Sequence, residues 1–205
     1  ITAKPLSVTA PTIQSKVYDG QVTAGAVTVG TLSGFVASET VTASGTAANY
    51  SSANVGSYSA AVTYTLADGL NGGLAGNYSL AADTATGTIT AKDVTIGGGS
   101  VLGKVYDGNT TAAVTASVTI TGLVAGETLG TTTATGTFTS KDVGTRNVAA
   151  SYTLADGANL ASNYNLLNPT ETLSAAITAK DVTIGGGSVL GKVYDGNTTA
   201  AVTAS

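Results

Sequence analysis

An internal repeat limits the folds open to this chain more than any other feature of its sequence. The segment Lys-Val-Tyr-Asp-Gly occurs three times, beginning at Lys16, Lys104 and Lys192, and both 104 − 16 and 192 − 104 give 88 residues. A second marker, Ile-Thr-Ala-Lys, keeps the same interval at Ile1, Ile89 and Ile177. Two independent markers on one period indicate a tandem array of structurally equivalent units.

The markers divide the 205 residues into two complete units and part of a third. We expect residues 1–3 to end a preceding repeat, residues 4–91 and 92–179 to form two repeats, and residues 180–205 to supply only the first strands of another. Units two and three are identical at all 29 positions that can be compared. Two strands alone cannot bury a core, so the partial repeat needs more of its own chain or the strands of a neighbour.

The pattern within each unit is that of short β-strands. Leu6 and Val8 alternate with polar residues, as do Val94 and Ile96, and no stretch shows helical periodicity over more than one turn. Asp-Gly pairs and Gly-rich segments mark turns between the strands. The sequence therefore predicts an all-β chain of tandem immunoglobulin-like β-sandwich repeats of 88 residues, joined end to end.

Several strands can be placed more closely. Gly-Gly-Gly-Ser at 97–100 predicts a break in the first strand, which would let that strand cross between the two sheets. Second strands are predicted at 24–29 and 112–120, the longest strands at 58–66 and 147–154, and last strands at 85–91 and 173–179. The last strands run directly into the next unit, and so short a junction should restrict bending.

Composition excludes several classes of function. With 8 basic and 12 acidic residues the net charge is −4, which gives nucleic acid no basic surface to bind. The absence of His and Cys removes the commonest general base and the commonest metal ligands, so we expect no enzyme and no cofactor. No apolar run approaches the ~18 residues of a membrane span, so no membrane insertion is expected here.

The repeated Tyr-Asp-Gly segments are interpreted as structural turn and core markers: Tyr18, Asp19, Gly20, Tyr106, Asp107, Gly108, Tyr194, Asp195 and Gly196. Asp and Gly tolerate the dihedral angles of a tight turn. We expect the tyrosine rings to be buried, with each hydroxyl bonded to a neighbouring backbone group, as at the corners of other sandwiches. Stacking of these rings on a ligand is the alternative.

Other polar residues allow more specialised chemistry. A Lys–Asn isopeptide cross-link beside a buried acid is one hypothesis, with the candidates Lys16, Glu39, Asn77, Lys104, Glu127 and Asn163. The alternative places these residues on turns without any cross-link. Turn aspartates could also collect calcium at repeat junctions, although no Asp-x-Asp-x-Asp spacing occurs.

Two further motifs have simpler explanations. Residues 98–104 match Gly-x-x-x-x-Gly-Lys, but the Ser or Thr and the helix of a phosphate-binding loop do not follow, so we interpret this segment as the strand break. Asn-x-Ser/Thr sequences fit the glycan acceptor pattern, and in a chain so rich in Ser and Thr several arise by chance. They begin at Asn49, Asn77, Asn109 and Asn197.

The ordered set Lys-Val-Tyr-Asp-Gly, Gly-Leu-Val-Ala-Gly-Glu-Thr, Tyr-Thr-Leu-Ala-Asp-Gly, Asn-Tyr-x-Leu and Ile-Thr-Ala-Lys resembles the YDG-type repeat of large bacterial secreted adhesins, the filamentous haemagglutinin-like surface proteins. The resemblance implies an extracellular, non-catalytic stalk that projects a binding tip from the cell. The implied partners are neighbouring repeats and a host or surface receptor at a tip outside this sequence. The alternatives are a subunit of a polymeric fibre built from other copies, and a carbohydrate- or receptor-binding module.

Overall fold

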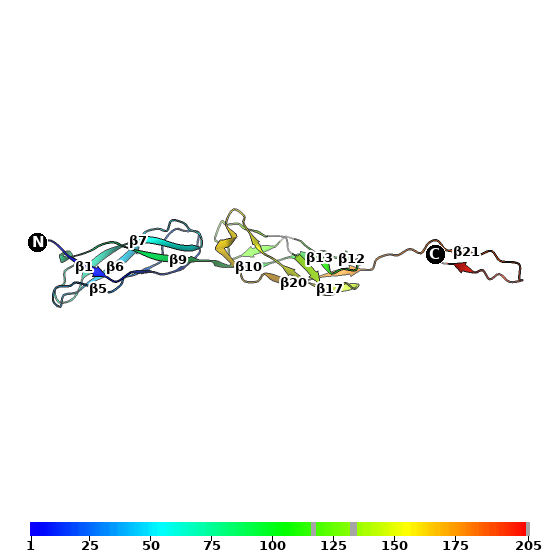
Figure 1. Cartoon of the computed structure of the whole chain (residues 1–205), viewed down its shortest axis with the longest axis horizontal. Helices are drawn as coiled ribbons and strands as arrows, with labels where there is room; N and C mark the ends of the chain where they lie inside the picture. Colours follow the sequence, from blue (N-terminus) through cyan, green and yellow to red (C-terminus); the bar gives the residue numbers. More distant parts are fainter. Residues whose placement is uncertain (116–117, 132–134, 204–205) are drawn as a thin grey trace.

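The computed structural model describes residues 1–115, 118–131 and 135–203. Two β-sandwich repeats follow one another along the long axis of the molecule, and a thin extended segment continues beyond them (Figure 1). The prediction of an all-β chain of tandem repeats is confirmed. Among the described residues, no helix has the length and apolar character that a bilayer crossing requires.

Repeat 1 contains nine strands and one single-turn 3₁₀ helix, η1 (Ala75–Asn77). The strands are β1 (Lys4–Val8), β2 (Thr12–Ile13), β3 (Lys16–Val17), β4 (Val27–Thr28), β5 (Leu32–Ser33), β6 (Val41–Ala47), β7 (Gly56–Asp68), β8 (Tyr78–Leu80) and β9 (Asp83–Thr90). They form a four-stranded sheet in the order β3-β9-β7-β6, a three-stranded sheet in the order β5-β1-β8, and the pair β2-β4.

The described residues of repeat 2 form eleven strands and a single 3₁₀ turn, η2 (Ala161–Asn163). Its strands are β10 (Lys92–Gly97), β11 (Ser100–Val101), β12 (Lys104–Val105), β13 (Thr111–Thr115), β14 (Thr119–Thr121), β15 (Gly130–Thr131), β16 (Thr135–Phe138), β17 (Gly144–Ser151), β18 (Leu154–Ala155), β19 (Tyr164–Leu166) and β20 (Thr170–Thr178). The main sheet has the order β11-β13-β16-β17-β20-β12, beside the smaller sheets β14-β10-β19 and β15-β18. Residues 116–117 of the predicted strand at 112–120 lie outside the described residues.

The third segment forms only the hairpin of β21 (Ser188–Val189) and β22 (Val202–Thr203), and residues 204–205 lie outside the described part of the chain. Every residue from 180 to 203 is exposed to solvent. Tyr194 retains 94% of its reference exposure, in contrast to 4% for its counterpart Tyr18. These first strands of a repeat therefore bury no core in this structure.

The first strand of each repeat is broken and changes sheets, as the Gly-rich segment predicts. In repeat 1, β1 pairs in parallel with β8, and β3, later on the same path, pairs in parallel with β9 in the other sheet. In repeat 2, β10 pairs with β19 and β12 pairs with β20 in the same way. Gly98, within the break, has φ +81°, a conformation that L side chains rarely adopt.

Strand alternation fills the space between the sheets with apolar side chains. Ala60 and Val62 on β7 face inward, as do Ala85 and Ile89 on β9, while the residues that alternate with Ala60 and Val62 are exposed. In repeat 2, Phe138, Val148 and Ile177 occupy corresponding inward positions. The buried cluster of repeat 1 also contains Val94 and Tyr164 of repeat 2, so apolar packing continues from one repeat into the next.

One pair of core positions shows how the repeats fill the same space with different atoms. In repeat 1 the ring of Tyr50 lies over Gly87, where an added Cβ would come 1.9 Å from the Tyr50 hydroxyl oxygen. The positions 88 residues later are Phe138 and Ala175, which pack in one cluster. Repeat 1 therefore combines a tyrosine hydroxyl with a glycine at these two positions. Repeat 2 has no hydroxyl on its phenylalanine and fills the space with the methyl group of an alanine.

We predict that Gly87→Ala destabilises repeat 1 by about 1–3 kcal/mol, because the new methyl group overlaps the Tyr50 hydroxyl. Adding Tyr50→Phe should recover most of this loss by reproducing the pair found in repeat 2. The measurement is hydrogen-exchange protection of the β7 and β9 amides in both variants. Equal protection in Gly87→Ala and in the double variant Gly87→Ala/Tyr50→Phe would show that the new methyl group does not compete with the Tyr50 hydroxyl for space.

Candidate inter-repeat interface

The Lys-Val-Tyr-Asp-Gly segment forms a turn that is stabilised by its own side chains. Asp19 Oδ1 accepts the Lys16 ammonium at 2.7 Å and the Gln21 N–H at 2.9 Å, and Lys16 Nζ also donates to the Gln21 carbonyl at 2.8 Å. Gly20 takes φ +76°, which completes the reversal. Burial acts to raise the pKa of Asp19, but the hydrogen bond and charge of Lys16 outweigh it and the pKa is lowered.

The same network recurs in the later repeats. Lys104 Nζ donates to Asp107 Oδ1 at 2.8 Å and to the Asn109 carbonyl at 2.8 Å. Lys192 Nζ makes the equivalent contacts with Asp195 and Asn197. Because residues 180–203 are all exposed, the turn around Tyr194 is held by local contacts without a surrounding sandwich core.

The first turn presents Tyr18 to repeat 2. The Tyr18 hydroxyl donates to Glu127 Oε1 at 2.7 Å, and its ring packs edge-on against Tyr164 with centroids 5.4 Å apart at 78°. Gly20 adds to the fit, since a Cβ there would lie 3.2 Å from Glu127 Oε1 and 3.5 Å from Val124 Cγ1. Turn and acceptor therefore meet closely enough that a side chain at position 20 would crowd the contact.

A single carboxylate receives phenols from both repeats. Tyr164 donates its hydroxyl to Glu127 Oε2 at 2.5 Å and accepts the Val124 N–H at 3.1 Å. Burial, followed by the hydrogen bond to Glu127, raises the pKa of Tyr18 to about 12, and the same two causes raise the pKa of Tyr164. Both phenols keep their protons at neutral pH, so Glu127 can act as the acceptor of two strong, charge-assisted bonds.

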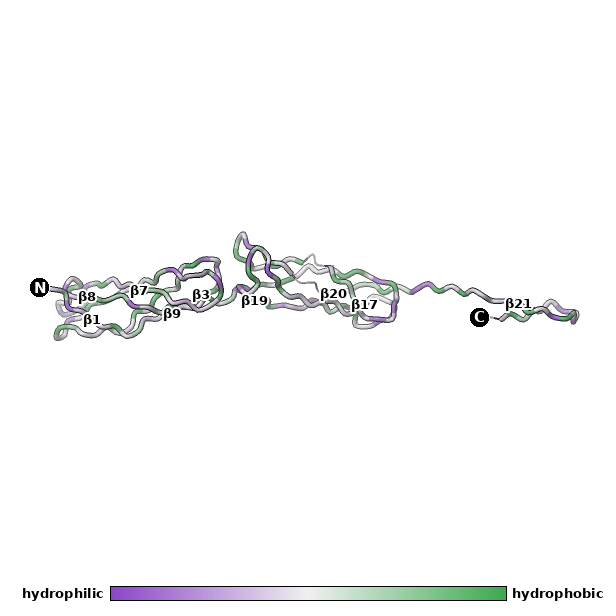
Figure 2. The backbone as a smooth tube through the Cα atoms, turned by 45° about the horizontal axis from the view of Figure 1, so that its top comes forward, coloured by the Kyte–Doolittle hydropathy of each residue, from purple (hydrophilic) through white to green (hydrophobic). Residues whose placement is uncertain are grey.

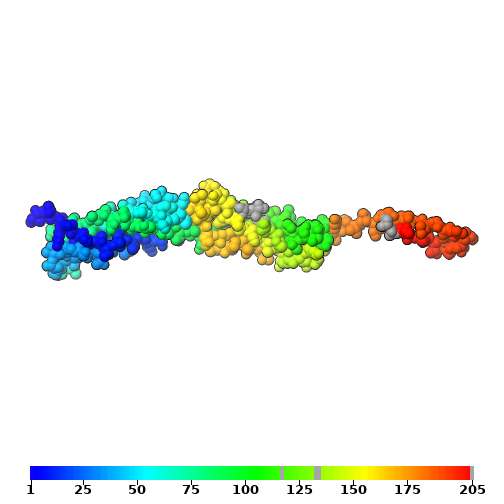
Figure 3. Space-filling view, in the orientation of Figure 1, coloured from blue at the N-terminus to red at the C-terminus, as the bar shows by residue number. Residues whose placement is uncertain are grey.

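A second set of contacts lies beside the phenols. Asn163, at the end of η2, is 1% exposed, and its Nδ2 donates to Asn54 Oδ1 at 3.0 Å. The Val55 N–H donates to Asn163 Oδ1, also at 3.0 Å. In Figure 3 this part of repeat 1 meets the region of repeat 2 that contains η2. The side-chain amide group and the side-chain carbonyl group of Asn163 thus both form hydrogen bonds with repeat 1.

The buried tyrosine ring was predicted from the sequence, but the partner of its hydroxyl was not. Tyr18 bonds to a carboxylate of the next repeat and not to a nearby backbone group, which corrects the expectation. Tyr106, in the same turn of repeat 2, is only partly buried, and Tyr194 is exposed. Full burial of this tyrosine accompanies contact with a following repeat.

The candidates for an isopeptide bond do not come together within a repeat. Lys16 lies on β3 and pairs with Asp19, whereas Glu39 and Asn77 lie near β8, at the other end of repeat 1 (Figure 2). Lys104 is separated from Glu127 and Asn163 in the same way, because β12 lies at the end of repeat 2 away from the junction (Figure 1), where Lys104 pairs with Asp107. Glu39 instead accepts the Tyr78 hydroxyl at 2.6 Å.

Two other aspartates hold nearby loops. Asp68 Oδ1 accepts the Ala75 N–H at 2.7 Å, and Asp156 Oδ1 accepts the Ala161 N–H at 2.7 Å, so each holds the loop that leads into a 3₁₀ turn. Within residues 1–115, 118–131 and 135–203, no three His, Cys, Asp or Glu side chains gather into a group that could hold a metal ion.

Asn54, Val55, Val124 and Tyr164 were not assigned to the junction by the sequence. One available signal was that Val124, Glu127 and the pair Asn163-Tyr164 repeat the earlier Val36, Glu39 and Asn77-Tyr78, while some of their neighbours differ. That signal marks positions that are retained between units. It does not show at which end of a repeat they lie, and this information was needed to pair them with Tyr18.

Comparison with known protein families gives one finding. The model of the YDG domain matches the chain twice, over residues 2–86 and 90–172. No curated protein and no solved structure matches the chain.

Tyr18→Phe should open the junction without unfolding either repeat. Loss of a hydrogen bond to a charged group costs about 1.5–3 kcal/mol, so exchange of the Val55 amide, which donates to Asn163, should accelerate at least about tenfold. The matched control is Tyr106→Phe, which removes the same hydroxyl from repeat 2. Unchanged Val55 exchange in Tyr18→Phe would show that this bond does not hold the repeats together.

Alkaline pH should weaken the junction through Tyr18. Its folded pKa of about 12 exceeds the ordinary tyrosine value of about 10, so its stabilising contribution is complete below about pH 10 and is lost as the pH rises toward 12. Among the nine tyrosines, Tyr18 should therefore ionise at a higher pH than an ordinary tyrosine, and its contribution should be missing in Tyr18→Phe. Phenolate absorbance of the two proteins, subtracted across the titration, measures this. A difference curve centred near pH 10 would contradict the assignment.

Proposed function

Because the chain belongs to the YDG domain family, with two domains in tandem, we propose that it is a non-catalytic spacer region of a bacterial extracellular adhesin. In this role the repeats form a stalk that projects a binding tip from the cell surface. The observation that carries the proposal is the junction, where Tyr18 and Asn54 of one repeat bond to Glu127 and Asn163 of the next.

The direction of the strands supports a role in spanning distance. In Figure 1 the long strands run along the axis on which the repeats follow one another. The length of the strands therefore adds directly to the length of the molecule. Strand β7 has 13 residues, which corresponds to about 43 Å at the usual rise per strand residue. Only Ala91 separates the end of β9 from the start of β10, so almost none of the chain is spent on a linker.

The composition of the junction supports a stalk that resists bending. Apolar packing passes from Ile89 of repeat 1 to Val94 and Tyr164 of repeat 2 within one buried cluster. Partly buried hydrogen bonds fix the orientation of the two repeats, because bending the junction would leave Glu127 and Asn163 without some of their partners. A flexible tether would need neither feature.

The proposal is tested by the distribution of distances between the two repeats. The chain has no cysteine, so spin labels on cysteines introduced at exposed Thr42 and Thr172 report only this distance. The wild-type junction should give one narrow distribution, and Tyr18→Ala should broaden it. Tyr106→Ala is the matched control and should leave it narrow. A broad wild-type distribution would argue against a stiff stalk.

The proposed location has a separate test. Antibodies raised against this chain should label intact bacteria that produce the full-length protein, at a distance from the cell envelope in electron micrographs. Labelling that requires lysis of the cells would contradict an extracellular role.

A further inference from the structure

A turn at the N-terminal end of repeat 1 places an asparagine directly before two glycines. Asn71 has φ +56° and Gly72 has φ +85°, and both residues are exposed. Gly73 is buried, and a Cβ added there would lie 2.0 Å from the Thr40 carbonyl oxygen. The turn therefore has a free tip at Asn71 and Gly72 and is anchored at Gly73.

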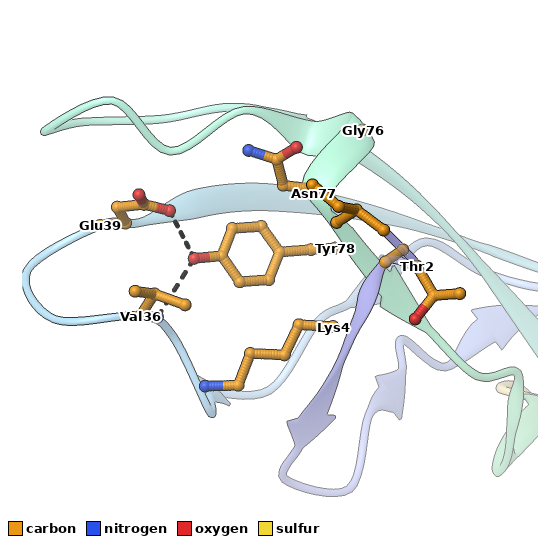
Figure 4. A pocket seen from close by; sticks show the side chains of 9 residues that line it. Thr2, Lys4, Val36, Glu39, Gly76, Asn77 and Tyr78 are labelled. Atoms are coloured by element: carbon orange, nitrogen blue, oxygen red, sulfur yellow. Dashed lines mark hydrogen bonds between the residues drawn. The ribbon is translucent and has the colours of Figure 1, made fainter.

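The side chain of Asn71 fastens this tip to the neighbouring loop of residues 36–39. Asn71 Nδ2 donates to the Ser38 carbonyl oxygen at 2.8 Å. The same loop supplies the Glu39 carboxylate, which accepts the Tyr78 hydroxyl at 2.6 Å (Figure 4). The Asn71 amide thus supports a loop whose carboxylate is engaged with a buried phenol.

The reactivity of an Asn-Gly pair depends on the room around the glycine. The backbone nitrogen that follows an asparagine can attack the side-chain carbonyl carbon, and a side chain on the following residue obstructs this approach. Gly72 has no side chain, and a Cβ added to it would meet nothing within 4 Å. The peptide group between Asn71 and Gly72 must rotate out of the turn before the nitrogen reaches Cγ, and glycine in open space permits this rotation.

The corresponding turn of repeat 2 holds its asparagine in a different setting. Asn159 is followed by Leu160, whose side chain shields the backbone nitrogen. The Asn159 side chain acts as an acceptor, because its Oδ1 receives the Thr128 N–H at 3.2 Å. Ala158 and Leu160 stay exposed although repeat 1 packs against this end of repeat 2. A preceding repeat therefore leaves such a turn open to solvent.

We propose that Asn71 is a site of spontaneous deamidation. The Gly72 nitrogen forms a bond to Asn71 Cγ while the bond from Cγ to Nδ2 breaks. The proton of the Gly72 N–H passes through water to the leaving nitrogen, which departs as ammonia, and a five-membered succinimide ring remains. Water then adds to one of the two ring carbonyl carbons and reopens the ring. Position 71 becomes either aspartate or isoaspartate, and water is the co-reactant.

Deamidation reverses the polarity of the contact with Ser38. An asparagine amide nitrogen donates hydrogen bonds, whereas an ionised carboxylate only accepts them. A carboxylate at position 71 therefore faces the Ser38 carbonyl oxygen without a proton between them, one residue from the negative charge of Glu39. The loop of residues 36–39 should open more often as the protein ages.

Mass spectrometry of the full chain after incubation in mildly alkaline buffer tests the site. Fragment ions should show that Asn71 gains the mass difference between an amide and a carboxyl group, at least about tenfold faster than Asn159, because only Asn71 precedes a glycine. Gly72→Ala adds a methyl group beside the attacking nitrogen and should slow the gain. Unchanged mass at Asn71, equal rates at the two asparagines, or no slowing in Gly72→Ala would each overturn the proposal.

A matched pair of substitutions tests the effect on the loop. Asn71→Asp reproduces one product, and it should speed hydrogen exchange of the Glu39 amide, which donates to the Val36 carbonyl at 2.9 Å, by about threefold to tenfold. Asn159→Asp keeps the acceptor at its position and should leave exchange of the equivalent Glu127 amide unchanged. Equal effects of the two substitutions would overturn the role assigned to the Asn71 amide.

Discussion

The Glu127 carboxylate, shared by Tyr18 and Tyr164, is the interaction on which the arrangement of the repeats depends. An ionised carboxylate only accepts hydrogen bonds, and in a site of low polarity it needs donors to offset the loss of water. Repeat 2 supplies one donor and repeat 1 supplies the other. Each repeat therefore completes the polar groups of its neighbour, and relative orientation becomes part of the stability of the fold.

The two sides of this interface are prepared by different means. The Tyr-Asp-Gly turn is held by short-range contacts of lysine and aspartate, and the same contacts occur at Lys192, where the surrounding residues are exposed. The acceptor side depends on the sandwich, because Tyr164 is fixed by pairing of β19 with β10. A rigid local turn docking on a rigid folded surface loses little conformational freedom on contact.

The sequence was sufficient to predict the repeat period, the all-β class, the broken first strand and the burial of Tyr18. These features follow from local composition and alternation. The pairing of Tyr18 with Glu127 was not predictable in this way, because the residues are 109 positions apart and belong to different repeats. Lys16, Glu39 and Asn77 were grouped as cross-link candidates on residue type alone, whereas strand direction places them at opposite ends. The volume exchange between Tyr50 and Gly87 likewise required the register of the main sheet.

The connection through Ala91 has a consequence for how such a protein can change over generations. Because β9 ends one residue before Ala91 and β10 starts one residue after it, the repeats join without a linker. Each unit has acceptor residues at one end and a Tyr-Asp-Gly turn at the other. Recombination that removes or duplicates a whole 88-residue block leaves each remaining joint chemically intact. Such recombination would therefore change the length of the protein in steps of one repeat.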